Sequence, residues 1–220
     1  MTSADVGIHP WRLLRNASSV DTPFALRLVV HGRSGGVVPT GLTTLVEELQ
    51  ARRQASVQLE VLTSEVTLEQ PTQPLLLIPL LLWPGTHVRE DVPMIRQRLR
   101  AEGADVTMLP FLGSWSVWWD LVASALDLRS DRSMVLVHHP LRAGVADCFL
   151  RTLSQRLGLP MVPFDAWAAY QSREPHRRPL PLALAPNRMT EALRDAEGVP
   201  PLLDHPLIRQ GFIDLLAALP

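Results

Sequence analysis

Short apolar segments alternate with amphipathic helical segments along most of this chain, and this alternation constrains the fold more than any other feature. Residues 24–31 (FALRLVVH) form an apolar run that ends at Gly32, and helical spacing of apolar residues follows at 40–53. Residues 75–82 are apolar on both faces, which is typical of a strand in the middle of a parallel sheet. This order predicts an α/β fold in which small parallel sheets are flanked by helices.

One connection departs from the alternation. The strands predicted at 57–61 and 75–82 are separated by too few residues for a normal crossover helix, so we expect a loop there. A helix is again expected from residue 88 to Gly103, followed by a strand at 106–109 and a helix at 114–126.

The second half of the chain repeats the order of the first. Three segments match in sequence: 133–138 (SMVLVH) with 26–31 (LRLVVH), 180–186 (LPLALAP) with 78–84 (IPLLLWP), and 203–219 with 112–126. The shared order predicts an internal duplication. It makes His138 the counterpart of His31 and Met189 the counterpart of His87, and we expect a structural role for His138 and His139.

The duplication predicts three parts. Residues 1–23 are an N-terminal extension, residues 24–129 a first lobe with the site, and residues 130–220 a degenerate second lobe. A chain with two copies of one unit has no need, by symmetry, of a second chain, which favours a monomer.

Composition narrows the function classes. The 21 basic and 22 acidic residues give no electrostatic reason to expect nucleic acid or an anionic membrane as partner. The single cysteine, Cys148, excludes an intrachain disulfide. The first twenty residues lack the apolar core of a secretory signal, and the apolar run 75–83 is too short to span a bilayer. We therefore expect a cytoplasmic protein.

Two histidines are the strongest candidates for chemistry. His31 and His87 lie 56 positions apart, and each follows the end of a predicted strand. Ligands of open parallel sheets bind outside the carboxyl ends of the strands, so we expect both side chains in one cleft. Two neutral imidazoles can bind a divalent transition metal or accept protons near neutral pH. The alternative is that each histidine only satisfies a loop carbonyl.

Acidic residues near these histidines have two interpretations. Glu65 follows the second strand and is either a third ligand or proton carrier, or a solvated loop carboxylate. Glu90 and Asp91 fall in the first turn after His87, where we expect them to compensate the helix N-terminus.

Tryptophan, arginine and glycine complete the candidate set. Trp115, Trp118 and Trp119 are spaced to share one helix face, which indicates either core packing or a surface for a flat apolar ligand. Arg33 is the arginine best placed to bind a carboxylate of a ligand. The glycine-rich stretch 32–36 matches neither a dinucleotide fingerprint nor a P-loop, and no nucleophile elbow occurs in the chain.

Three segments together resemble one family. Residues 28–34 (LVVHGRS) resemble the strand-then-His-Gly-Ser-Arg opening of the sirohydrochlorin cobalt- and ferrochelatases, the class II tetrapyrrole chelatases, with Arg33 and Ser34 in swapped order. Residues 78–93 (IPLLLWPGTHVREDVP) are similar to their second motif, in which Gly-x-His leads into a helix that begins with Asp-Ile-Pro. Residues 109–113 (LPFLG) are similar to their loop before the last helix.

The resemblance implies insertion of Fe²⁺ or Co²⁺ into sirohydrochlorin, in sirohaem or cobalamin biosynthesis. It makes His31 and His87 the catalytic residues. The metal ligands that we expect are these two histidines and Glu65. The implied reaction needs no organic cofactor and makes the tetrapyrrole the main partner. The substrate contacts that we expect come from four residues: Arg33, Ser34, Trp83 and Gly85.

The alternative is a non-catalytic relative that binds a tetrapyrrole or a metal without turnover. The swapped Arg33 and Ser34, the absent crossover helix and the degenerate second copy favour this alternative. Two histidines alone do not select between iron, cobalt and nickel.

Overall fold

The computed structural model describes residues 23–32, 36–64, 66, 68–70, 72–142, 144–194 and 198–220. The N-terminal extension predicted over 1–23 therefore lies almost wholly outside the described residues. Two compact units divide the rest: unit 1 comprises the described residues up to Trp118 together with Gly211–Pro220, and unit 2 comprises Trp119–Gln210. No helix in the described part of the chain is both long and apolar enough to cross a membrane.

Unit 1 is built on a four-stranded sheet. Its strands run parallel in the order β2-β1-β3-β4, and their bounds are β1 Ala25–Val30, β2 Val57–Val61, β3 Leu75–Pro79 and β4 Val106–Met108. Every residue of β1 and β3 is buried, as expected of strands with neighbours on both sides and helices on both faces. The predicted parallel α/β arrangement is confirmed.

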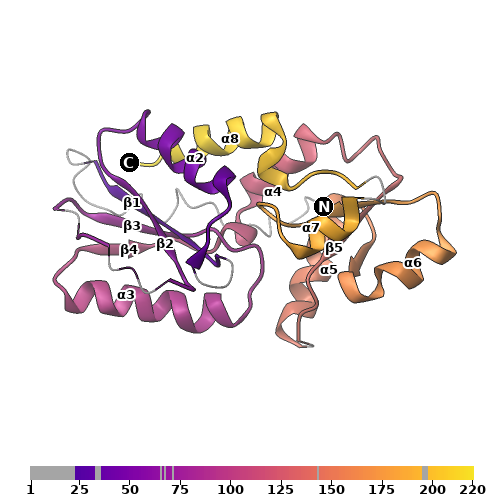
Figure 1. Cartoon of the computed structure of the whole chain (residues 1–220), viewed down its shortest axis with the longest axis horizontal. Coiled ribbons are helices and arrows are strands. Elements are labelled where there is room, and N and C mark those ends of the chain that lie inside the picture. Colours follow the sequence, from indigo (N-terminus) through magenta and orange to yellow (C-terminus); the bar gives the residue numbers. More distant parts are fainter. Residues whose placement is uncertain are drawn as a thin grey trace, which may run out of the picture. The chain divides into compact units, whose positions relative to one another are not determined.

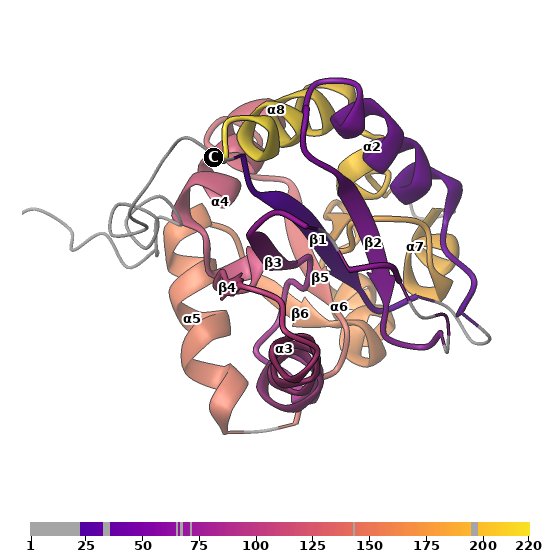
Figure 2. The same ribbon diagram turned by 90° about the vertical axis from the view of Figure 1, so that its left-hand side faces the viewer.

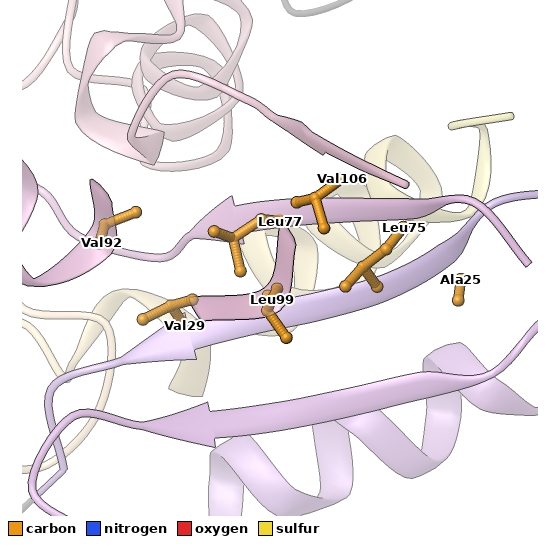
Figure 3. Packing of buried hydrophobic residues seen from close by; sticks show 7 residues of the cluster. All are labelled: Ala25, Val29, Leu75, Leu77, Val92, Leu99 and Val106. Carbon is orange, nitrogen blue, oxygen red and sulfur yellow. The ribbon is translucent and has the colours of Figure 1, made fainter. Parts of the chain in front are cut away.

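Helices cover both faces of this sheet (Figures 1 and 2). Helix α2, Thr40–Gln50, lies on one face together with the C-terminal part of α8, Pro206–Ala217. Helix α3, Val92–Ala101, lies on the other face. Figure 3 shows the apolar core that side chains of α3 form with the strands, which consists of Ala25, Val29, Leu75, Leu77, Val92, Leu99 and Val106.

Helix α4, Ser116–Ala125, follows the 3-10 turn η3, Leu112–Ser114, and leads from unit 1 into unit 2. The predicted tryptophan face is core: Trp115, Trp118 and Trp119 are all buried. Trp115 Nε1 donates to the Pro110 carbonyl at 2.9 Å, and the Trp118 ring meets Phe212 edge-on at 5.0 Å.

The connection from β2 to β3 contains no helix in its described residues, 62–64, 66, 68–70 and 72–74, as its length predicts. A buried arginine anchors this loop. Arg27 lies in the middle of β1, on the same face as Ala25 and Val29, and its side chain is fully buried. Its Nη2 donates to the Glu69 carbonyl of the loop at 2.8 Å and to Gln58 Oε1 at 2.6 Å.

Glu60 balances the charge of Arg27. Its Oε2 lies 3.4 Å from Arg27 Nη1, and its Oε1 accepts from Arg98 of α3. Burial lowers the pKa of Arg27, whereas the nearby Glu60 carboxylate opposes that shift. The polar cluster thus ties the sheet, the loop and α3 together on the face where a crossover helix would otherwise pack.

Unit 2 has a three-stranded parallel sheet in the order β6-β5-β7. Its strands are β5 Met134–His138, β6 Met161–Pro163 and β7 Arg178–Pro181, and its helices are α5 Val145–Leu157, α6 Trp167–Arg173 and α7 Arg188–Leu193. The 3-10 turns η4, Phe164–Ala166, and η6, Leu202–Asp204, precede α6 and α8. This strand order repeats β2-β1-β3 of unit 1, and η6 repeats the place of η3 before a helix.

The strand register aligns the two units and corrects one predicted correspondence. The Leu80 N–H donates to the Val29 carbonyl, and the Leu182 N–H donates to the Val137 carbonyl, both at 2.8 Å. Two residues beyond Val137 is His139, so by strand register His139 takes the place of His31, one residue after the predicted counterpart. His138 nevertheless makes the same contact as His31, because the Nδ1 atom of each lies 2.7 Å from the carbonyl oxygen of the next residue.

Burial agrees with this register. His138 is buried like the last residue of β1, whereas His139 and His31 are both exposed. A shift of one residue moves a side chain to the opposite face of the sheet, and the similar strand letters concealed that shift.

We predict that Arg27→Ala lowers the free energy of unfolding by about 3–5 kcal/mol, because it removes the buried cation that pairs with Glu60 and donates to Gln58 and to the Glu69 carbonyl. Arg98→Ala is the matched control. Arg98 pairs with the same Glu60 but its side chain is 40% exposed, so its loss costs about 1 kcal/mol or less. Urea denaturation of both variants measures the difference, and equal losses would refute a special role for Arg27.

Candidate metal centre

The two histidines singled out in the sequence lie against each other in unit 1. His31 directly follows β1, and His87 follows β3 after a short loop. Because β1 and β3 are adjacent and parallel, their carboxyl ends share one edge of the sheet. The centroids of the two imidazole rings are 4.5 Å apart, and the ring planes meet at 73°. The parallel pairing thus brings two residues far apart in sequence to one point.

A backbone contact orients the His31 ring. Its Nδ1 lies 2.7 Å from the Gly32 carbonyl oxygen. A carbonyl only accepts, so this contact favours the form with the hydrogen on Nδ1. Gly32 adopts φ +75°, and a Cβ there would lie 2.4 Å from Val61 Cγ1. The turn that orients His31 therefore requires glycine.

His87 begins a π-helical turn, η2, His87–Asp91. The Val92 N–H reaches back five residues to the His87 carbonyl. Pro93 follows; it has no N–H, and in a regular α-helix its ring would clash with the carbonyl four residues before it. A wider turn accommodates that ring, and π turns of this kind recur at functional sites.

Asp91 is a site residue that the sequence interpretation missed. Its Oδ2 lies 2.5 Å from His87 Nδ1, whereas we expected only compensation of the helix N-terminus. The neighbouring Glu90 is exposed. The spacing of four residues between His87 and Asp91 is the signal that could have revealed the contact, since residues four apart face each other on a helix.

The arrangement is suited to a loosely held divalent ion. Both histidines direct Nδ1 to an acceptor, and such a contact favours the tautomer with an open Nε2 on each ring. The His87 side chain is 44% exposed, so solvent and ligands reach it. Within the part of the chain that the structure describes, no group of three or more His, Cys, Asp or Glu could hold a metal ion. Two imidazoles with water bind an ion less tightly than a closed four-ligand site.

The other predicted site residues divide into two groups. Trp83 is half-buried, and Gly85 lies on the loop to His87 with open space where a Cβ would be. Arg33, Ser34 and Glu65 lie outside the described residues, so their roles stay predictions.

The corresponding edge of unit 2 lacks the second imidazole. Asn187 Nδ2 lies 3.4 Å from His139 Nε2, the atom that corresponds to the open nitrogen of His31. Met189 takes the place of His87 and is fully buried in the unit 2 core. This edge therefore offers no pair of open nitrogens.

Unit 2 also contains an open pocket of about 510 Å³ on the α5 side of its sheet. Burial lowers the pKa of His138, which lines it. Arg151 shares the lining with two carboxylates, Asp147 and Asp165, and this mixture of charges defines no ligand class.

No protein-family model matches the chain, and no curated protein is significantly similar to it. Solved structures do match. SirB from Bacillus subtilis with Fe³⁺ superimposes with a TM-score of 0.66 at 13% identity, over 89% of this chain and 96% of that chain. The chain has the fold of the sirohydrochlorin chelatases.

Two further chelatase structures agree. SirB from Bacillus subtilis subspecies spizizenii in complex with cobalt gives a TM-score of 0.57 at 16% identity, over 88% of this chain and 94% of that chain. CbiX, the terminal enzyme for biosynthesis of sirohaem in denitrifying bacteria, gives 0.58 at 21% identity, over 90% and 100%. The expected chelatase fold is therefore confirmed at the level of architecture, and the matches extend over both units.

We predict that Gly113→Ala displaces the loop that carries His87. Gly113 belongs to the loop after β4, its N–H donates to the Leu81 carbonyl at 3.0 Å, and an added Cβ would lie 2.0 Å from the Leu82 carbonyl oxygen. Backbone must move to relieve this clash, so we expect loss of stability and weaker metal binding.

Gly85→Ala is the control, because its Cβ meets nothing within 4 Å. Thermal unfolding compares the two variants, and a Gly113→Ala protein as stable as Gly85→Ala would contradict the packing argument.

Proposed function

We propose that this protein inserts Fe²⁺ or Co²⁺ into sirohydrochlorin. The main support for this proposal is the pair of imidazoles at the edge of the unit 1 sheet. Their ring centroids are 4.5 Å apart, and Nδ1 of each ring contacts a hydrogen-bond acceptor. The chelatase fold supports the proposal, since two of the matched proteins were solved with Fe³⁺ or cobalt. Here the metal ion is a substrate, and the proposal requires no organic cofactor.

The chemistry makes two demands that this site meets. Metal insertion forms metal–nitrogen bonds to the macrocycle and releases two pyrrole N–H protons. The imidazoles of His31 and His87, whose ring centroids lie 4.5 Å apart, would hold one ion through Nε2, and after handing it on they would accept the protons. Imidazole serves both tasks near neutral pH because it is a metal ligand and a base of suitable strength.

The remaining predicted residues have proposed roles around this pair. The open space beside Gly85 and the half-buried Trp83 would receive an edge of the flat ring. Arg33 and Ser34 would bind carboxylates of the substrate, and Glu65 would be a third metal ligand. Binding energy from such contacts can bend the ring and expose its nitrogen lone pairs. We place the reaction in the cytoplasm.

We predict that His31→Ala and His87→Ala each slow metal insertion by about 10²-fold or more, which is the usual contribution of a positioned general base. The absorption spectrum of sirohydrochlorin mixed with Co²⁺ and protein reports the rate, against the uncatalysed reaction. His176→Ala is the matched control, since His176 is 67% exposed and lies in the connection before β7.

Two outcomes would overturn the proposal. Full activity in both histidine variants would reject the assigned residues. A wild-type protein that shifts the sirohydrochlorin spectrum without inserting metal would instead be a binding protein, the non-catalytic alternative.

A further inference from the structure

We propose that Asp91 is a positioning residue, which holds His87 as the Nδ1–H tautomer and thereby makes Nε2 its metal-binding atom. The catalytic consequence rests on the proposed function, whereas the tautomer rests on geometry alone. Nothing in the sequence pattern assigned this task to Asp91.

The contact itself selects the tautomer. A neutral imidazole carries its hydrogen on either nitrogen, and a partner that can only accept favours the form with the hydrogen on the facing nitrogen. The ionised carboxylate of Asp91 is such a partner, and its Oδ2 lies 2.5 Å from His87 Nδ1. Histidines that bind metals regularly donate their other ring N–H to a carboxylate or a carbonyl, which fixes the ring and strengthens the metal bond.

The local backbone holds His87 and Asp91 close together. His87 and Asp91 are the first and last residues of the π-helical turn η2. The turn continues directly into α3, whose Val92 and Leu99 are anchored in the unit 1 core. The carboxylate is thus carried by a helix packed on the core, and the loop before His87 has open space beside Gly85.

The exposure of the His87 and Asp91 side chains indicates that Asp91 positions the ring and contributes little to stability. The His87 and Asp91 side chains are 44% and 40% exposed, and exposed ion pairs contribute little to stability. Removal of the carboxylate should therefore leave the fold intact and change the orientation of the ring. The effect should appear in metal binding before it appears in unfolding.

His31 provides an internal control. Its Nδ1 is bound by the Gly32 carbonyl, a backbone group that no substitution at position 91 removes. The two imidazoles thus reach the same tautomer by different partners, one a charged side chain and the other the main chain. A change at Asp91 should alter His87 and leave the hydrogen position on His31 unchanged.

Nitrogen NMR of the histidine rings tests the tautomer directly, in the full-length protein without metal. We expect the Nδ1–H form for His87 in the wild type, and a shift toward the Nε2–H form in Asp91→Ala. Asp91→Asn should also lose the Nδ1–H form, because its amide N–H can donate to Nδ1 and so favours the Nε2–H form. Glu90→Ala, one residue away on the same turn, should change nothing.

Calorimetric titration with Co²⁺ measures the consequence. Loss of a carboxylate behind a metal-binding histidine typically weakens affinity by about 10–100-fold, and we expect that loss for both Asp91→Ala and Asp91→Asn and no effect of Glu90→Ala. An Nε2–H tautomer for His87 in the wild type, or unchanged tautomer and Co²⁺ affinity in Asp91→Ala, would overturn the inference.

The test separates this inference from the proposed function. If the wild type binds Co²⁺ and shows the expected tautomers but inserts no metal into sirohydrochlorin, the positioning role is supported and the chelatase proposal fails. If insertion occurs and Asp91→Ala matches the wild type in tautomer and affinity, the chelatase proposal stands and the positioning role fails.

Discussion

The parallel pairing of β1 with β3 is the interaction on which the site depends. It aligns Val29 with Pro79, so both strands end at the same edge of the sheet. The segments that follow them bring His31 and His87 together at that edge. His31 needs only the turn at Gly32, and His87 needs only a short loop and a π turn. A shift of one residue in this register would turn every side chain of the strand to the opposite face and remove His31 from its partner.

The polar cluster at Arg27 protects that pairing on the face where the crossover helix is absent. Where the loop between β2 and β3 packs against the sheet beside α3, its backbone groups need partners. Arg27 supplies donors to the Glu69 carbonyl and to Gln58, and Glu60 joins Arg98 of α3 to the same cluster. The hydrogen bonds and ion pairs of Arg27 therefore hold the short connection in place where a helix would otherwise pack.

The sequence predicted the architecture better than the details of the site. The positions of the strands, the missing helix and the meeting of His31 with His87 followed from apolar periodicity and from the geometry of parallel sheets, although the strand predicted over 75–82 ends at Pro79. Asp91 was assigned to the helix terminus because a carboxylate in a first turn has an ordinary electrostatic explanation, and only side-chain geometry shows that it faces an imidazole. His138 was aligned with His31 because similar strand letters do not define which face a residue occupies. The roles of Arg33, Ser34 and Glu65 stay predictions.

The central claim is that one metal ion binds between two imidazoles from adjacent strand ends. X-ray absorption of the protein loaded with one equivalent of Co²⁺ counts the imidazole nitrogens around the ion. The account predicts two in the wild type and one in either His31→Ala or His87→Ala. A cobalt ion with no imidazole ligand, or with two that persist in both variants, would contradict it.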